Sequence, residues 1–384
     1  MTPKPWLAVP LVLLVLVSGL AAQAPPPPER FFDAAPVEHD GIRLTVFYPT
    51  VGTVRDIVGL RQVGFLDIPD LTVIGVYHVR EVSNYEAAKT FVKGGGYDWF
   101  KFHAVDAAIG PDDLFRRNAC TPEFETIVRK SDGVIFFGGP DIPPAVYGRK
   151  TSLLTGIDDP FRHYFEVSAV FHLLGGSQDA RFMPLLASRP DFPVFGICLG
   201  FQTLNVGTGG TLIQDIWTEI YYKNTVEELF PLGEEAWHTS PYAKLRPDIR
   251  NLIRYSFHSL DLAPKGMFCR LLGFAAGSDH PRILSAHHQA VDKPGQGWRV
   301  SAVSRDGKVI EAMEHTQFAN ALGVQFHPEH ARLWDGSLEF VETPDAAATT
   351  SFRAILENAP PSWEFHRKIW EWYGDCLQRS AAGK

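Results

Sequence analysis

The sequence predicts an α/β protein in which helices wrap a mainly parallel sheet, and two observations carry this prediction. Short runs of β-branched and aromatic residues alternate with segments of helical periodicity, the order expected when each parallel strand returns through a helix. Hydrophobic residues make up 45% and charged residues 21% of the 384 positions, so the chain can bury a large core.

The first part of the chain supplies most of the alternation. Helical periodicity is found at 85–92 and 123–129, and a longer helix is expected to begin at Asp159 and Pro160, a suitable N-cap and first-turn pair. Strands and helices that alternate in this way predict parallel pairing. The expected strands of this part lie at 44–48, 73–79, 133–137 and 194–197.

The pattern changes in the last quarter of the chain. Two apolar runs, 298–303 and 309–313, flank the pair Asp306-Gly307, which predicts a hairpin closed by a tight turn. One further strand is expected at 321–326.

The first residues are typical of a secretory signal peptide. Lys4 is the only charge before Glu29, and an apolar stretch leads into small residues, so cleavage is expected after Ala21 or Ala24. The alternative is a membrane anchor, but the apolar stretch is shorter than the roughly 20 residues that span a bilayer. We therefore expect a periplasmic or secreted protein with no stable membrane insertion after signal cleavage.

One large domain is expected to follow. Between 363 and 378, apolar residues recur at helical spacing, which predicts a terminal helix that docks on the body of the protein. The tail is assigned to packing or to contact within an oligomer. The expected organisation is a signal peptide at 1–24, a proline-rich linker at 25–40, an α/β domain at 41–345 and a C-terminal helical extension at 346–384.

Charge and cysteine content exclude several classes of protein. There are 36 basic and 44 acidic residues, and the net charge of −8 argues against nucleic acid or an anionic membrane as the main partner. Four cysteines are too few for a disulfide scaffold in a chain of this length. We expect Cys120, Cys269 and Cys376 to be structural or free, although an oxidising compartment could join two of them.

Cys198 is the strongest candidate for a nucleophile. It lies in the segment Gly-Ile-Cys-Leu-Gly, which follows the apolar strand at 194–197 and precedes a helical segment. A strand that turns sharply into a helix through Gly-x-Cys-x-Gly holds the central side chain exposed in a strained conformation. The alternative is a buried structural cysteine.

His327 and Glu329 are candidates for the base and its partner. They belong to the segment His-Pro-Glu, which ends the strand expected at 321–326. An unperturbed thiol is only about 3% ionised at pH 7, so an imidazole that takes its proton raises the reactive fraction roughly 30-fold. Glu329 would accept the other ring N–H and fix the tautomer. On its own, this segment could be an ordinary turn.

A pair of glycines follows the strand at 133–137. Gly138 and Gly139 can present backbone N–H groups that no side chain covers. We expect the amides of Gly139 and Leu199 to form an oxyanion hole, since losing one such donor costs about 10²- to 10³-fold in rate. The alternative is a turn that merely ends the strand.

Together these segments resemble the class I glutamine amidotransferase-like superfamily, and within it the γ-glutamyl hydrolase and γ-glutamyl-γ-aminobutyrate hydrolase group. The resemblance covers roughly residues 125–330 and rests on five motifs. The motifs lie at 132–144, 196–205, 209–215, 287–291 and 323–329.

The resemblance implies a three-layer αβα sandwich with a mainly parallel, flavodoxin-like sheet. It implies Cys198 as nucleophile, His327 as base and Glu329 as the acid that orients it. It also implies that the glutamyl head group is held near the glycine loop and two further motifs. The implied binding residues are Gly138, Gly139, Gln202 and His288.

Three features depart from the family pattern. The region before residue 125 begins differently, Leu199 stands where many relatives carry Arg, and a long insert at 216–286 separates two motifs. In the insert, Trp237-His238 and the segment 256–259 could line the substrate entrance.

Several histidines could be taken for a metal site, but we expect none. Adjacent histidines and histidines three positions apart sometimes bind zinc. The thiol mechanism already uses one of them, and His330 is expected to face solvent. The histidines concerned are His287, His288, His327 and His330.

The main hypothesis is an exported cysteine hydrolase that cleaves a γ-glutamyl amide through a γ-glutamyl thioester on Cys198. It needs no metal or organic cofactor, its partner is a small-molecule γ-glutamyl substrate rather than nucleic acid, and a homo-oligomer is possible. One alternative is a glutaminase subunit that supplies ammonia to a synthase partner, which the signal-like N-terminus weakens. Another is a non-catalytic binding protein of the same fold.

Overall fold

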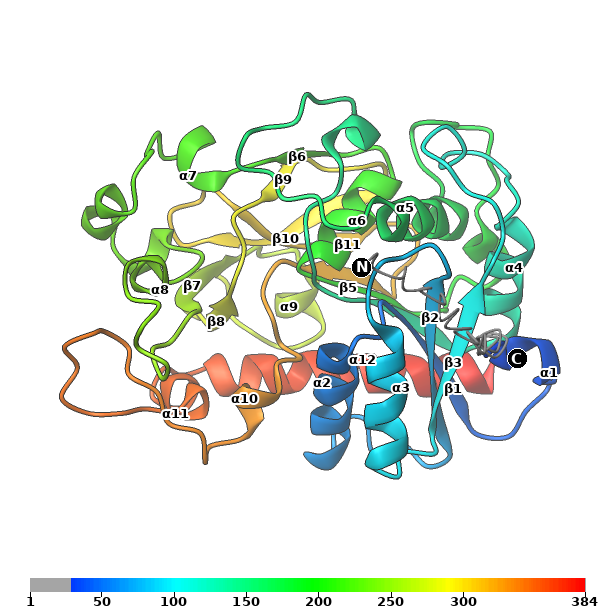
Figure 1. Cartoon of the computed structure of the whole chain (residues 1–384), viewed down its shortest axis with the longest axis horizontal. Helices are drawn as coiled ribbons and strands as arrows, with labels where there is room; N and C mark the ends of the chain where they lie inside the picture. Colours follow the sequence, from blue (N-terminus) through cyan, green and yellow to red (C-terminus); the bar gives the residue numbers. More distant parts are fainter. Residues whose placement is uncertain (1–28, 384) are drawn as a thin grey trace, which may run out of the picture.

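The computed structural model describes residues 29–383, which fold around one ten-stranded mixed sheet (Figure 1). The strand order is β3-β2-β1-β4-β5-β12-β11-β10-β7-β8. Helices cover both faces of this sheet, so the predicted three-layer αβα fold is confirmed. The signal peptide expected at 1–24 lies outside the described residues. No helix in the described part of the chain is long and apolar enough to cross a membrane.

Six neighbouring strands form a parallel half that is flavodoxin-like. The pairing of β5 with β12 aligns Ile197 with Val324, so the chain segments that follow these two strands leave the same edge of the sheet. The parallel strands are β1 (Ile42–Phe47), β2 (Leu71–His78), β3 (Phe100–Val105), β4 (Gly133–Phe136), β5 (Val194–Ile197) and β12 (Ala321–Val324).

Successive side chains of these strands enter two different cores. In β4, Ile135 packs with the core beneath α2, α3 and α12, whereas Val134 and Phe136 pack with the core beneath α4, α5 and α6. A strand covered on both faces must be apolar at consecutive positions, which explains its continuous hydrophobic sequence. The covering helices are α2 (Val51–Gln62), α3 (Tyr85–Gly94), α4 (Thr121–Lys130), α5 (Pro160–Leu174), α6 (Leu199–Gly207) and α12 (Ser362–Ala382).

The other half of the sheet is antiparallel. The predicted hairpin is confirmed, with Gly307 at φ +73° in the turn that joins its two strands. Two further strands, β7 and β8, extend the sheet beyond it. The antiparallel strands are β7 (Ser256–Leu262), β8 (Arg282–Ser285), β10 (Trp298–Ser304) and β11 (Ile310–His315), and a small separate sheet holds β6 (Thr211–Ile213) and β9 (Ala290–Lys293).

The insert at 216–286 lies beside the antiparallel half and contributes β7 and β8 to it (Figure 1). Its remaining elements are short, namely α7 (Ile216–Glu219), η3 (Glu227–Leu232), η4 (Glu234–Ala236), α8 (Pro241–Leu245) and α9 (Met267–Arg270). Short elements outside the insert are α1 (Phe31–Ala34), η1 (Pro144–Tyr147), η2 (Leu185–Ser188), α10 (Ala331–Trp334) and α11 (Phe352–Glu357).

Both ends of the described chain pack on the sheet. In α1, the side chain of Phe32 is fully buried, and Arg30 forms an ion pair with Glu123 of α4. The terminal helix α12 docks as predicted, with Trp370 and Tyr373 fully buried. The indole of Trp370 donates to the carbonyl of Pro328 at 2.9 Å, so this helix supports the segment that carries His327 and Glu329.

Candidate active site

Cys198 occupies the sharp turn between β5 and α6, as the sequence predicted, but it is buried rather than exposed. Its backbone has φ +53° and ψ −108°, a strained conformation for a residue with a side chain. A Cβ on Gly196 would lie 2.8 Å from the carbonyl oxygen of Gly200, and one on Gly200 would lie 2.0 Å from that of Phe136. Both glycines are therefore required by the close approach of neighbouring backbone.

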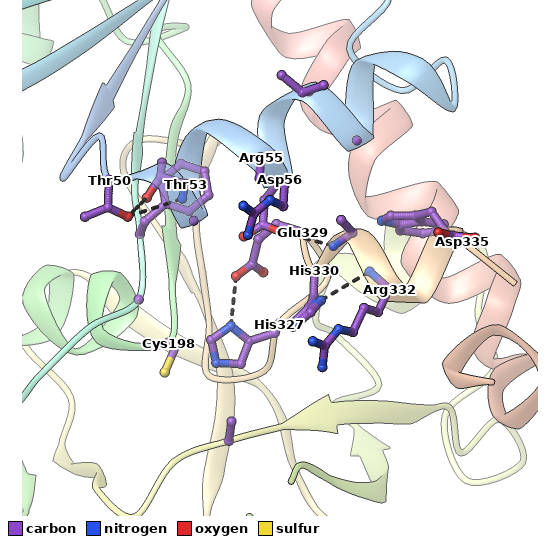
Figure 2. Close-up of a pocket in the computed structure, with 18 of the residues that line it drawn as sticks. Thr50, Thr53, Arg55, Asp56, Cys198, His327, Glu329, His330, Arg332 and Asp335 are labelled. Carbon is purple, nitrogen blue, oxygen red and sulfur yellow. Dashed lines mark hydrogen bonds and ion pairs between the residues drawn. The ribbon is translucent and has the colours of Figure 1, made fainter. Parts of the chain in front are cut away.

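His327 follows β12 and lies beside this turn (Figure 2). Its Nδ1 is 2.8 Å from Oε1 of Glu329, the predicted contact between the imidazole and its orienting acid. A Cβ on Gly138 would lie 3.2 Å from His327 Cε1 and 3.5 Å from Cys198 Cβ, so the glycine loop touches both residues. The structure thus brings all three predicted catalytic residues together at one edge of the sheet.

Charge at this edge favours a protonated imidazole. Burial on its own would lower the pKa of His327, but the neighbouring charges of Glu329 and of Cys198 outweigh burial and hold this pKa well above its usual range. A cationic imidazole beside the sulfur is the arrangement that stabilises a thiolate nucleophile.

Asp56 of α2 is a second acid near His327 that the sequence did not reveal. It lies in the same cleft as Glu329 (Figure 2), and its Oδ1 accepts the backbone N–H of Ala331 at 3.1 Å. Burial, followed by the negative charge of Glu329, raises the pKa of Asp56 to about 7. No motif marks α2, so only the fold brings this carboxyl to the site.

The glycine loop is held from behind by Arg162 of α5, another residue that the sequence did not single out. This guanidinium is fully buried, forms an ion pair with Glu166 at 2.8 Å and stacks on Tyr48. It donates to the carbonyls of Phe137 at 2.8 Å and Gly138 at 3.2 Å. In a trans peptide the N–H points opposite to the C=O, so the amide of Gly139 points away from Arg162.

Gly139 has to be glycine because of this clamp. A Cβ there would lie 1.8 Å from Nη1 of Arg162, too close for any side chain. The same residue also lines the cleft that contains Cys198.

The two remaining predicted binding residues lie apart from the cleft lining. Gln202 is buried, and its Nε2 donates to Oε1 of Gln325 at 3.2 Å. His288 lies between Asp141 and Asp215, at 3.1 and 3.4 Å. Burial would lower the pKa of His288, but its hydrogen bonds to the two carboxylates raise it to about 9.

A model of the peptidase C26 family matches residues 73–329, which is more than half of the chain. The chain belongs to the peptidase C26 family. This membership confirms the resemblance to class I glutamine amidotransferase-like proteins and makes the protein a hydrolase of that type.

Curated relatives agree with the family. The chain is 30% identical over 213 residues to a glutamine amidotransferase-like protein of Rickettsia prowazekii, a match that covers 52% of this chain and 70% of that protein. It is 33% identical over 237 residues to a protein of Mycobacterium tuberculosis that is named for its similarity to glutamine amidotransferases, covering 59% of this chain and 60% of that protein. Among solved structures, a glutamine amidotransferase from Thermotoga maritima aligns over 88% of this chain and 100% of its own, with 12% identity and a TM-score of 0.38.

In this C26 family member, the edge of the sheet that holds Cys198 and His327 opens into a cleft of about 930 Å³. Arg55 of α2 and Arg332 of α10 line it. Neither guanidinium forms a hydrogen bond or an ion pair with another described side chain, although each stacks on a phenylalanine. Two cations therefore border the cleft that contains Cys198, and the charge of Arg55 also acts on the carboxyl of Asp56.

His330 also lines the cleft, and the expectation that it faces solvent was wrong. Its Nε2 lies 2.8 Å from the hydroxyl of Tyr255, and burial lowers its pKa to about 3. The cap that His330 provides for α10 draws the ring inward, because its Nδ1 accepts the N–H of Arg332.

The four histidines considered as a metal site do not form one cluster. His288 contacts two aspartates, His327 contacts Glu329 and His330 contacts Tyr255, whereas His287 lies in a different buried cluster with His238. The four cysteines of the described chain are free.

The insert residues that we considered for the substrate entrance, Trp237, His238 and 256–259, do not line the cleft. His238 and His258 are completely buried, and neither belongs to the cleft lining. The insert forms part of the antiparallel half of the sheet, so these side chains turn into the protein rather than toward the cleft.

Proposed function

We propose that this C26 family member is an exported cysteine hydrolase that cleaves γ-glutamyl amide bonds. The observation that carries the proposal is the meeting of Cys198, His327 and Glu329 at the edge of an open cleft. A thiol in a strained turn, beside an imidazole whose other nitrogen is fixed by a carboxylate, is suited to nucleophilic attack on an amide.

The first half of the reaction forms a thioester. The Cys198 sulfur attacks the γ-carbonyl carbon, and the amides of Gly139 and Leu199 stabilise the oxyanion of the tetrahedral intermediate. The direction of the Gly139 N–H, away from the Arg162 clamp, supports this role. His327 protonates the leaving nitrogen as the C–N bond breaks, so the amine departs neutral.

The second half resolves the thioester with water. His327 takes a proton from the attacking water, the tetrahedral intermediate collapses, and the sulfur leaves with its electron pair. Glutamate is released, and Cys198 and His327 return to their starting protonation states. Glu329 keeps the imidazole ring in one orientation through both halves.

The cleft offers groups that suit a glutamyl head. The unpaired guanidiniums of Arg55 and Arg332 match the α-carboxylate, since Arg binds carboxylates with paired hydrogen bonds. The carboxyl of Asp56, or that of Asp335, suits the α-ammonium group. Gln202 would act indirectly, through Gln325, whose amide contacts the sulfur of Cys198, and His288 has no assigned part in binding.

Export forms a separate part of this proposal. It is supported by the signal-like composition of residues 1–24. Expression in the native host, followed by fractionation and N-terminal sequencing, tests it. We expect a periplasmic or secreted chain that begins after Ala21 or Ala24, whereas an uncleaved chain in the cytoplasm would contradict export.

The direct test is a panel of γ-glutamyl amides in which the released amine and glutamate are measured. The matched substrates are the corresponding α-glutamyl amides, and the matched protein is Cys198→Ala. We expect release from γ-glutamyl amides only, and none with the variant. Ammonia formed from free glutamine only after a synthase partner is added would instead favour the glutaminase alternative.

A further inference from the structure

A second polar cluster lies sealed inside the antiparallel half of the sheet. His238 follows η4 in the insert, His258 lies on β7, His287 follows β8 and Glu311 lies on β11. Their relative exposures are 0%, 0%, 5% and 0%. Three imidazoles and one carboxylate thus meet where they are almost completely shielded from solvent.

Hydrogen bonds satisfy only part of this cluster. His258 Nε2 lies 3.1 Å from Glu311 Oε1, and His287 Nδ1 lies 2.9 Å from the carbonyl oxygen of Gln289. Within the described chain, both ring nitrogens of His238, Nε2 of His287 and Oε2 of Glu311 are buried without a well-formed hydrogen bond, although Nδ1 of His238 and Nε2 of His287 face Glu311. Buried polar groups nearly always have partners, so several orphans in one place indicate a missing ligand.

The spacing of these atoms suits a metal ion. Ligand atoms of His238, His287 and Glu311 all lie within 4.8 Å of one another. Nδ1 of His238 is 3.3 Å and Nε2 of His287 is 3.7 Å from Oε1 of Glu311. An ion bonded tetrahedrally at about 2.0–2.1 Å separates neighbouring ligand atoms by about 3.4 Å.

Neighbouring groups orient these side chains by hydrogen bonds, as is usual for metal ligands. His287 contacts the Gln289 carbonyl through Nδ1, which fixes the tautomer that leaves Nε2 free to bind a metal. His258 contacts the Glu311 carboxylate through Nε2 and so holds it in one orientation. The carbonyl of His238 accepts the N–H of His287 and the hydroxyl of Ser285, which holds the strained His238 backbone, with φ +51°, in place.

We propose that His238, His287 and Glu311 bind one divalent transition-metal ion, zinc by preference, and that His258 orients Glu311. Imidazole nitrogens and a single carboxylate suit zinc, whereas Mg²⁺ and Ca²⁺ require oxygen ligands. The ion would be structural, because its ligands are buried and none of them lines the cleft. It fastens the insert to the sheet.

From the sequence we expected no metal. His287 was considered only with its neighbours His288, His327 and His330, whereas its partners come from the insert and from β11. The ligands are spread over many positions of the chain, so no short motif reveals them.

The test begins with metal analysis of the full chain, purified without a histidine tag or chelator and then equilibrated with excess Zn²⁺ and desalted. We expect about one zinc per chain in the wild type. In His287→Asn and Glu311→Gln, the zinc content per chain should fall at least about tenfold. His258→Gln should bind zinc about 10- to 100-fold more weakly, as expected for an orienting residue. His163→Gln is the matched control, since His163 is equally buried with both ring nitrogens unpartnered but belongs to no such group in residues 29–383.

A second measurement uses wild-type protein, so that the test does not depend on variants that fail to fold. Wild-type protein is stripped with a chelator and reloaded with Zn²⁺ or Co²⁺, while the melting temperature and the visible spectrum are followed. We expect the melting temperature to fall on stripping and recover on reloading, with a tetrahedral Co²⁺ absorption band. Cys198→Ala should give the same results, so that the outcome is independent of the proposed hydrolase activity. Wild type that stays free of metal after loading and shows no shift in melting temperature would overturn the proposal.

Discussion

Two polar clusters lie on neighbouring strands of one sheet and differ chiefly in access to solvent. The proposed catalytic cluster around Cys198 and His327 opens into a cleft, whereas the cluster around His238 and Glu311 is buried away from it. They are close in the fold, because the N–H of Gln325 on one side donates to the carbonyl of Glu311 on the other at 2.8 Å. The comparison teaches that similar side chains can be given different surroundings on neighbouring strands, one set beside a cleft and the other buried away from it.

The largest expected effect on the cleft cluster alone comes from replacing the nucleophile. Cys198→Ala removes the only group that can form the thioester, so kcat/KM for a γ-glutamyl amide should fall by about 10⁴-fold or more. Zinc content and melting temperature should remain those of the wild type, because the sealed cluster is untouched. Assays of turnover and metal content on the same preparation check both expectations, and substantial remaining turnover would contradict the assigned role.

The orienting acid should have the next largest effect. Glu329→Gln keeps the shape of the side chain but removes the charge that holds the His327 ring and its tautomer. We expect kcat to fall about 10²- to 10⁴-fold, as in other triads that lose their acid. Glu342→Gln, which neutralises an exposed acid outside the cleft lining, is the control and should keep most of the activity.

Arg162 is buried, yet it holds the glycine loop that lines the open cleft, so its two contributions can be measured separately. Arg162→Met leaves Glu166 buried without its cation, which should cost about 3–5 kcal/mol of unfolding free energy. The double variant Arg162→Met/Glu166→Leu should regain most of that stability. It should not regain kcat, since the clamp on the Phe137 and Gly138 carbonyls is still missing. Recovery of both quantities would reduce Arg162 to a purely structural role.

The cleft arginines should affect binding more than turnover. Arg55→Ala and Arg332→Ala each remove a charged donor from the cleft, so KM should rise about tenfold or more for a substrate with a free α-carboxylate. A substrate whose α-carboxylate is amidated should lose this difference. Arg181→Ala, which removes an exposed arginine outside the lining, is the control, and an equal effect on both substrates would contradict carboxylate recognition.

The smallest expected effect is on the pH dependence of stability. The pKa of Asp56 is raised to about 7 in the folded protein, above its usual value near 3.8, so ionisation destabilises the fold as pH rises between these values. Asp56→Asn should therefore raise the melting temperature at pH 8 and leave it nearly unchanged at pH 4. The amide oxygen of Asn can still accept the Ala331 N–H. Equal shifts at both pH values would argue against a buried ionised Asp56.

Local motifs predicted the parallel sheet and the catalytic edge, because each rests on a short continuous segment. The turn at Cys198 requires glycine on both sides, and the short segment that holds His327 and Glu329 became informative in combination with that turn. The terminal helix was predicted because its apolar residues recur at helical spacing over many turns.

The rest depends on contacts between segments far apart in the chain. The helix α2 has no separate motif, so neither Asp56 nor Arg55 could be assigned to the cleft. The strands β7 and β8 lie in the insert, where the resemblance gives no guidance, and with them the placement of His258 was missed. Arg162 acts through backbone carbonyls, and this role leaves no signature in residue spacing.

Mass spectrometry of the protein mixed rapidly with a γ-glutamyl amide and quenched in acid tests the central claim most directly. We predict a transient mass increase of one glutamyl group that maps to Cys198 and is removed by hydroxylamine, as expected for a thioester. Cys269→Ala should give the same adduct, and Cys198→Ala should give none. Turnover without any adduct on Cys198, or an adduct on another residue, would contradict the account.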